Sequence, residues 1–294
     1  MKQPHWPERW DFRKGAIYYR PRESERADFD GKYYFRLGKD EHEAFNTWFT
    51  RFPHAKPRTI REAIWMYQAT DAYAKLATKT QKDYSKALDR LTEVFGGVAP
   101  GDLLPTDVYD YMDLRPVTAA NRDRSVLQNV MQLCVRRGVV KHNVVRDVDK
   151  NTEEPRDRYV TDEEVDAFLK YCSPFLTAWV ELKLITGLRQ GQLRSLRVSD
   201  WDGTRLTAQG AKKGRTVIFE GPGLKEAVDA VLALRKGRRL HSMYLFSTRY
   251  GTQYADNGFQ SIWHRAMAKY VGEGGQHFTE HDLRAKVASD RDSV

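Results

Sequence analysis

A few residues in the second half of the sequence have the chemistry needed to act on a phosphate. Arg189 follows the run TGL at the end of a largely apolar segment. Packing of that segment can fix the arginine while its planar guanidinium grips two phosphate oxygens. His281 and Arg284 lie three residues apart, which places both on one face of a helix. Taken singly, each of these residues is more often structural than functional.

A pair of lysines lies between these two segments. Residues 205–220 read RLTAQGAKKGRTVIFE, which predicts two strands around a turn containing Lys212, Lys213 and Gly214. Lysines at the tip of a hairpin are usually only solvated. A lysine held over a cleft could instead protonate a leaving alkoxide, and the pattern by itself leaves Lys212 and Lys213 as alternatives.

The elements that must position these residues can be read from residues 156–294. Thr161 and Glu164 form a capping box that predicts the start of a helix. Pro174 opens a largely apolar helix that Gly187 ends, and the following QGQLRSL predicts another short helix. Further on we expect helices over 221–237, 256–272 and 279–290 and a short strand over 244–248.

Residues 59–155 have a helical pattern. Thr59 and Glu62 form a second capping box, and apolar residues then recur at helical spacing through four predicted helices. Four helices in about a hundred residues predict a small bundle. Five basic residues are expected to line its outside: Arg122, Arg124, Arg136, Arg137 and Lys141.

Residues 9–39 have the pattern of a small sheet. Two aromatic runs, AIYYRPR and GKYYFRLGK, flank a polar turn with Asp30 and Gly31. One interpretation is a marginal sheet with a solvated face, and the other is a β-sheet reader of DNA. Polar stretches with prolines predict linkers near 53–57 and over 151–158. Basic residues alternate with the aromatics: Arg13, Lys14, Arg20, Arg22, Lys32, Arg36 and Lys39.

Composition supports a polyanionic partner without proving one. The chain has 49 Lys and Arg against 40 Asp and Glu, a net charge of +9, with the excess at both ends. A basic balance favours nucleic acid. No secretory signal is recognisable at the N-terminus, and no apolar run approaches the roughly 20 residues of a membrane span. Cys134 and Cys172 make no metal-ligand spacing and are expected to be reduced thiols in a cytosolic protein.

The ordered combination of these features resembles the tyrosine recombinases of the phage integrase family. TGLR after a buried helix, a lysine-tipped hairpin and HDLR at a helix start follow the family's order. Either motif alone is weak, but the ordered set is specific, and the resemblance extends over essentially the whole chain. It implies a multi-domain, mainly α protein with small β elements. The domains would be an arm-type DNA-binding sheet over 1–58, a core-binding helical bundle over 59–155, and a mixed α/β catalytic domain over 156–294.

The resemblance also implies roles for the site residues. Arg189 corresponds to the first catalytic arginine, Lys212 to the hairpin lysine with Lys213 as its competitor, and His281 and Arg284 to the H-x-x-R pair. The guanidiniums would meet charge that develops on the phosphate oxygens, without a metal or other cofactor. The histidine and lysine would move protons while a tyrosine forms a covalent intermediate with the 3′ phosphate.

Two departures from the family pattern affect these expectations. Gln192 stands where the family usually has an acidic residue. The family's L-G-H-type box and nucleophilic tyrosine follow the H-x-x-R helix, whereas Tyr244, Tyr250, Tyr254 and Tyr270 all precede His281. We therefore expect a catalytic domain that lacks its C-terminal segment and its nucleophile.

The leading hypothesis is site-specific recombination that integrates or excises phage or mobile-element DNA. Double-stranded attachment sites would be the partners, with a homotetramer on paired sites and a directionality or DNA-bending protein. Cytoplasmic localisation on the nucleoid of a bacterial host is expected. The alternative is a non-catalytic DNA-binding remnant or regulator that occupies recombination sites. A metal-dependent nuclease would need clustered carboxylates, whereas the candidate residues are Arg, Lys and His.

Overall fold

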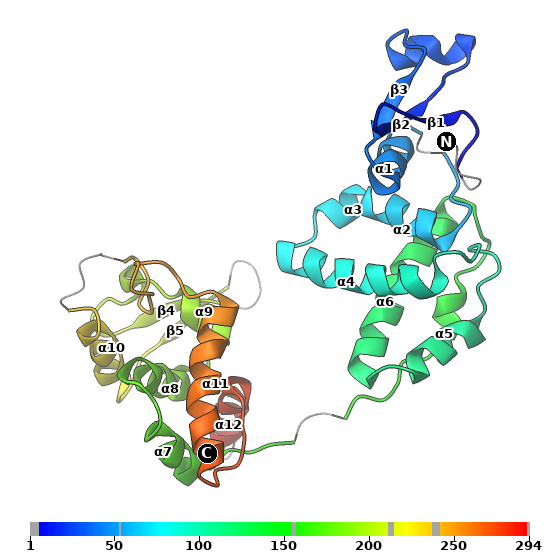
Figure 1. Ribbon diagram of the computed structural model, residues 1–294. Coiled ribbons are helices and arrows are strands. Elements are labelled where there is room, and N and C mark those ends of the chain that lie inside the picture. The colour runs from blue at the N-terminus through cyan, green and yellow to red at the C-terminus, as the bar shows by residue number, and fades with distance from the viewer. Residues whose placement is uncertain (1–5, 53, 155–156, 211–214, 237–241, 293–294) are drawn as a thin grey trace. The chain divides into compact units, whose positions relative to one another are not determined.

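The chain divides into two compact units, residues 1–155 and 156–294 (Figure 1). The computed structural model describes the chain except residues 1–5, 53, 155–156, 211–214, 237–241 and 293–294. Helices predominate and the sheets are small and antiparallel, which confirms the predicted fold class. The boundary that we predicted at residue 58 falls inside the first unit, and it stays a prediction.

The first unit begins with a three-stranded antiparallel sheet in the order β1-β2-β3. Its strands are β1 (Trp10–Arg13), β2 (Ala16–Tyr19) and β3 (Phe35–Gly38). The connection between β2 and β3 contains a 3₁₀ helix, η1 (Glu23–Phe29), that the sequence pattern did not predict. Asp30 and Gly31 end it with positive φ angles, as their turn-forming residue types favour.

A helix that the sequence analysis missed, α1 (Glu41–Arg51), packs on this sheet. The Asp40 side chain caps it by accepting from the backbone N–H of Glu43 at 2.8 Å. Its aromatic residues join Trp10 and other residues of the sheet in a buried cluster, to which α2 contributes Met66. The sheet therefore has one face covered by α1 and rests partly on the helices that follow.

Those helices form a second cluster around α4 and α6. Thr59 caps α2 as predicted, because its Oγ1 accepts from the Glu62 N–H, but the Glu62 carboxylate accepts from the Arg58 N–H, so the predicted reciprocal box is only half formed. Helix α6 buries Leu127 and Val130, as its periodicity predicts. The prediction that Arg124 lies on the outside was wrong, because its guanidinium is buried and donates to the carbonyls of Val145 and Val148. The helices are α2 (Ile60–Gln68), α3 (Asp71–Ala74), α4 (Thr78–Phe95), α5 (Pro105–Asp113), α6 (Val117–Arg136) and the 3₁₀ helix η2 (Val144–Asp147).

The second unit is built around the apolar helix α8, against which α10 and α12 pack. β4 and β5 form a two-stranded antiparallel hairpin in which Leu206 pairs with Phe219 and Gln209 with Thr216. The elements are α7 (Asp162–Leu169), α8 (Pro174–Thr186), α9 (Gln190–Ser195), the 3₁₀ helix η3 (Val198–Asp200), β4 (Leu206–Gln209), β5 (Thr216–Phe219), α10 (Leu224–Ala233), α11 (Asp256–Gly272) and α12 (Glu280–Asp292).

One predicted element of this unit is absent from the described residues. Residues 244–248 form only isolated bridges, Tyr244 with Arg197 and Ser247 with Gln253, instead of a strand. Leu245 and Phe246 are nevertheless buried in the core. The apolar run was therefore correctly assigned to the interior, but its backbone finds only single-residue pairings.

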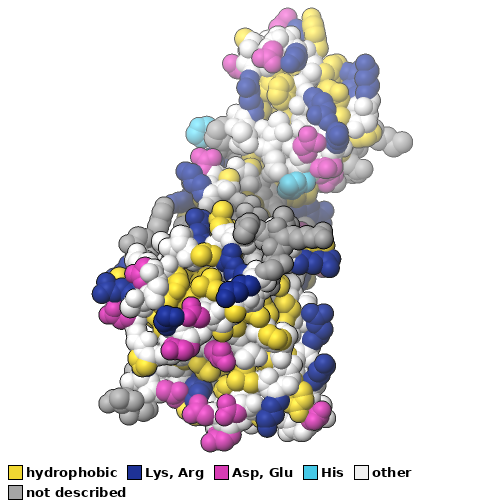
Figure 2. Space-filling view, turned by 90° about the vertical axis from the view of Figure 1, so that its left-hand side faces the viewer, with side chains coloured by type: hydrophobic (Ala, Val, Ile, Leu, Met, Phe, Trp, Pro, Cys, Tyr) yellow, Lys and Arg dark blue, Asp and Glu magenta, His cyan; other side chains and the backbone are white. Residues whose placement is uncertain are grey.

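The hydropathy of the helices and the distribution of charge on one face can be compared with the composition. Among the helices of the described part of the chain, none is long and apolar enough to cross a membrane. The face drawn in Figure 2 carries Lys and Arg side chains at several places, interspersed with Asp and Glu and with apolar side chains. On this face the positive charge is therefore spread out.

Candidate functional site

The turn that carries Arg189 is fixed by Gly187. This glycine ends α8 in the left-handed region at φ 61°, where a residue with a Cβ is strained. A Cβ built there would also lie 3.0 Å from Cγ1 of Val287 on α12. The backbone of the turn therefore favours glycine, and a larger residue would in addition press on the Val287 side chain of α12.

Gln192 ties this turn to the hairpin. Its Oε1 accepts from the backbone N–H of Arg189 at 3.0 Å, and its Nε2 donates to the carbonyl of Gln209 at 2.6 Å, at the end of β4. A carboxylate could accept the first hydrogen bond but could not donate the second. The amide at position 192 thus has a physical role that the acidic residue usual in the family would not fill.

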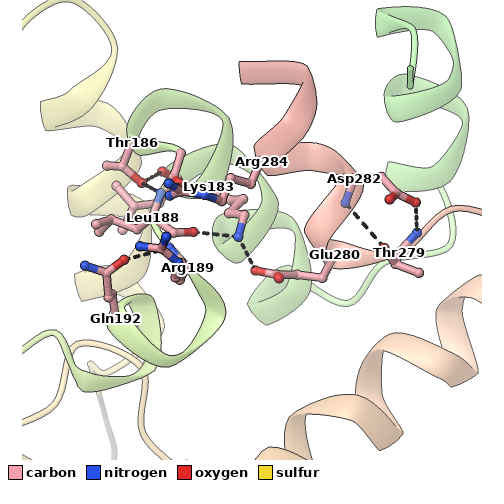
Figure 3. Close-up of polar contacts among 11 residues, drawn as sticks. Lys183, Thr186, Leu188, Arg189, Gln192, Thr279, Glu280, Asp282 and Arg284 are labelled. Carbon is pink, nitrogen blue, oxygen red and sulfur yellow. Dashed lines mark hydrogen bonds and ion pairs between the residues drawn. The ribbon is translucent and has the colours of Figure 1, made fainter. Parts of the chain in front are cut away.

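α12 begins at a reciprocal cap and carries both His281 and Arg284. The Thr279 N–H donates to Asp282 Oδ2 at 2.8 Å, and the Asp282 N–H donates to Thr279 Oγ1 at 3.3 Å. One turn into the helix, Arg284 Nη1 donates to the carbonyl of Gly187 (Figure 3). The second arginine is therefore anchored on the turn that presents the first.

A buried ion pair joins the same two elements. Lys183 on α8 is fully buried, and its Nζ donates to Glu280 Oε1 at 2.6 Å and to the carbonyl of Leu188 at 2.5 Å (Figure 3). Glu280 is the first residue of α12 and is 8% exposed. Sequence reasoning missed both residues because they lie 97 positions apart, and a lysine within an apolar helix was the only local signal.

The two arginines line one open cavity of about 420 Å³. Burial, followed by the nearby charge of Arg189, lowers the pKa of Arg284, and Glu280 opposes this shift. Like charges held close together, with the Glu280 carboxylate paired to Lys183, form a site that favours an anion. The cavity is lined by Thr186, Gly187, Leu188, Arg189, Gln192, Gly210, Arg215, Val217, Phe219, Arg284, Val287, Ala288 and Arg291.

His281 lines a different, smaller cavity of about 240 Å³. His264 and His277 line it as well, together with Gln190, the residue after Arg189. The helix thus carries His281 and Arg284 as predicted, but the residues that line the arginine cavity do not include the histidine. Within the part of the chain that the structure describes, no three His, Cys, Asp or Glu side chains are grouped so that they could hold a metal ion.

The hairpin lysine and the nucleophilic tyrosine are not found among the described residues that line the arginine cavity. Lys212 and Lys213 lie outside the described residues, although β4 and β5 flank them as the predicted hairpin requires. Of the residues described, no tyrosine lines the arginine cavity. The choice between the two lysines and the role of each site residue therefore stay predictions.

Comparison with solved structures defines the class of fold. The lambda integrase tetramer bound to a Holliday junction is similar with a TM-score of 0.68 and 18% sequence identity, over 97% of this chain and 91% of that chain. The Tn1549 transposon integrase in complex with circular intermediate DNA is similar with a TM-score of 0.67 and 15% identity, over 81% of this chain and 88% of that chain. The chain therefore has the integrase fold.

Comparison with protein families identifies the second unit. Residues 158–290 match the phage integrase family, so the chain carries a phage integrase family domain. This confirms the resemblance that the TGLR and HDLR segments indicated. No curated protein sequence matches the chain.

Proposed function

We propose that this chain acts in site-specific DNA recombination by a phosphotyrosyl mechanism, with Arg189 and Arg284 holding the scissile phosphate. The observation that carries the proposal is the placement of these two arginines on one cavity, inside a phage integrase family domain. Two fixed guanidiniums can stabilise charge on the non-bridging oxygens as a nucleophile attacks, and no metal is needed for this.

The same proposal assigns proton transfers to neighbouring groups. Lys212 or Lys213, on the hairpin that Gln192 ties to the arginine turn, would protonate the leaving 5′ oxygen. His281, on the first turn of α12, would assist proton transfer at the attacking oxygen. The nucleophile would be a tyrosine outside these 294 residues, because every tyrosine in the sequence precedes His281.

We infer that the first unit supplies the sequence-reading surfaces. All seven basic residues that alternate with the aromatics of 9–39 are exposed, and the guanidinium of Arg13 stacks over the ring of Tyr34 at 3.9 Å. A second candidate surface is an open cavity of about 660 Å³ at α4 and α6. Its lining has more basic residues (Lys79, Lys86, Arg90, Arg122 and Lys150) than acidic ones (Asp83, Asp123 and Glu153). These would be the arm-type and core-type DNA contacts, of residues 1–58 and 59–155.

Assembly and partners follow from the same reasoning. Strand exchange needs two sites cut on both strands, so we propose a homotetramer on paired attachment sites, working with a directionality or DNA-bending protein. One of the solved structures with a similar fold is that of a lambda integrase tetramer bound to a Holliday junction. Action on chromosomal DNA would place the protein in the cytoplasm.

Binding is the first experiment. Duplexes enriched from a random library by the 294-residue chain are titrated at several salt concentrations. We expect log K to fall linearly with log salt, by about 0.9 for each phosphate neutralised. A flat salt response would contradict the proposed basic surfaces.

Chemistry is the second experiment. The enriched duplex, end-labelled and nicked near its centre, is incubated with the chain and resolved on a denaturing gel. We expect no covalent protein–DNA adduct, because the nucleophile is not among these residues. A phosphotyrosyl adduct formed by this chain would show that one of its own tyrosines is the nucleophile.

A further inference from the structure

The buried pair of Lys183 and Glu280 connects the elements that carry the two arginines, in addition to the hydrogen bond from Arg284 to the Gly187 carbonyl. Lys183 holds the carbonyl of Leu188, the residue immediately before Arg189, at 2.5 Å. The same ammonium holds Glu280, one helical turn before Arg284, at 2.6 Å. One buried cation thus bonds to the backbone beside the first arginine and to the helix that carries the second.

The pair also decides what Arg284 can bind. Glu280 and Arg284 are four residues apart on α12, a spacing at which opposite charges pair. Instead, Lys183 takes the Glu280 carboxylate, and Arg284 donates to the carbonyl of Gly187. The Glu280 carboxylate is neutralised by Lys183, so the guanidinium charge of Arg284 stays available to an anion in the cavity. Burial lowers the pKa of Lys183, Arg284 lowers it further, and Glu280 opposes both.

We propose that Lys183 and Glu280 are positioning residues, which hold the Arg189 turn against the helix that carries Arg284. The inference rests on the proposed function for its meaning, but the positions themselves can be measured without DNA. A buried ion pair can often be replaced by apolar residues without loss of folding, whereas removing one partner leaves a buried charge. The informative variant is therefore the double change Lys183→Met with Glu280→Leu.

The readout is the arginine side-chain NMR spectrum of the full chain without ligand. In the unmodified chain we expect the Arg284 guanidinium protons to exchange slowly with water, because one of them donates to Gly187 O. In the folded double variant we expect that exchange to be at least tenfold faster. Lys286→Met is the matched control. Lys286 is a buried lysine of α12, but it bonds to Asp162, Asp290 and Tyr159. Its loss should leave the exchange rate at Arg284 unchanged.

A phosphate titration separates this inference from the proposed function. Inorganic phosphate should shift the Arg189 and Arg284 resonances, and its affinity should be about tenfold weaker in the double variant. If exchange at Arg284 accelerates but phosphate shifts neither arginine in the unmodified chain, positioning stands and the phosphate site is refuted. If a folded double variant keeps Arg284 exchange within twofold of the unmodified chain, the positioning role is overturned. Failure of the double variant to fold would equally overturn it, since the pair would then be needed for folding itself.

Discussion

Gly187→Ala is the substitution whose effect the structure defines most closely. Alanine at φ 61° costs about 1–2 kcal/mol because its Cβ crowds the following carbonyl. The new Cβ would lie 3.0 Å from Val287 Cγ1, and overpacking of this kind costs about 1–3 kcal/mol. We therefore expect a loss of roughly 2–5 kcal/mol in the free energy of unfolding. DNA affinity should fall as well, since the Gly187 carbonyl anchors Arg284.

Urea unfolding measures the stability change, and Gly191→Ala is the matched control. Gly191 lies in α9, where a Cβ meets nothing within 4 Å, so alanine should stabilise by about 0.5–1 kcal/mol. Adding Val287→Ala to Gly187→Ala should destabilise by less than the sum of the single changes, because the contact is then absent. If Gly187→Ala unfolds at the same urea concentration as the unmodified chain, the described turn is wrong.

Two further predictions concern the helical part of the first unit. Arg124→Met should lower the free energy of unfolding by roughly 2–4 kcal/mol, because two buried carbonyls lose their donor. The exposed Arg122→Met is the control, and its free energy of unfolding in urea should change by no more than about 0.5 kcal/mol. Burial, then the hydrogen bond to Asp123, raises the pKa of Tyr111 to about 12, so its contribution to stability is complete below pH 10 and is lost as the pH rises toward 12. The free energy of unfolding should fall by roughly 2–3 kcal/mol more over that window than in Tyr111→Phe, and parallel pH profiles for the two proteins would contradict this assignment.

Local signals predicted the elements that depend on local physics. Thr59 and Thr161 cap helix starts in the structure as their motifs predicted, because each cap bond lies within one helical turn; the reciprocal bond from the glutamate forms only at Thr161. The helix predicted over 256–272 is present as α11, and the apolar residues Phe259, Trp263 and Met267, which recur at helical spacing, are buried on it. Gly187 was correctly taken as a helix end, since a left-handed cap favours glycine.

Features that depend on distant contacts escaped sequence reasoning. The sequence predicted Arg124 on the surface, because its acceptor, the carbonyl of Val148, lies 24 residues away in the sequence. Lys183 and Glu280 pair only through the packing of α8 on α12. The reach of Arg284 to Gly187 likewise joins positions 97 residues apart. In each case the partner of a charged side chain is brought to it by long-range packing. A single sequence does not show which distant residues pack together.

The most direct test of the central claim is whether a DNA phosphate occupies the cleft between Arg189 and Arg284. The chain is treated with an arginine-selective dicarbonyl reagent, with and without saturating enriched duplex, and the modified peptides are quantified by mass spectrometry. A high-salt sample, in which the duplex dissociates, controls for reagent access. We predict that DNA protects both arginines and that high salt removes the protection. Equal labelling of both with and without bound duplex would contradict the account.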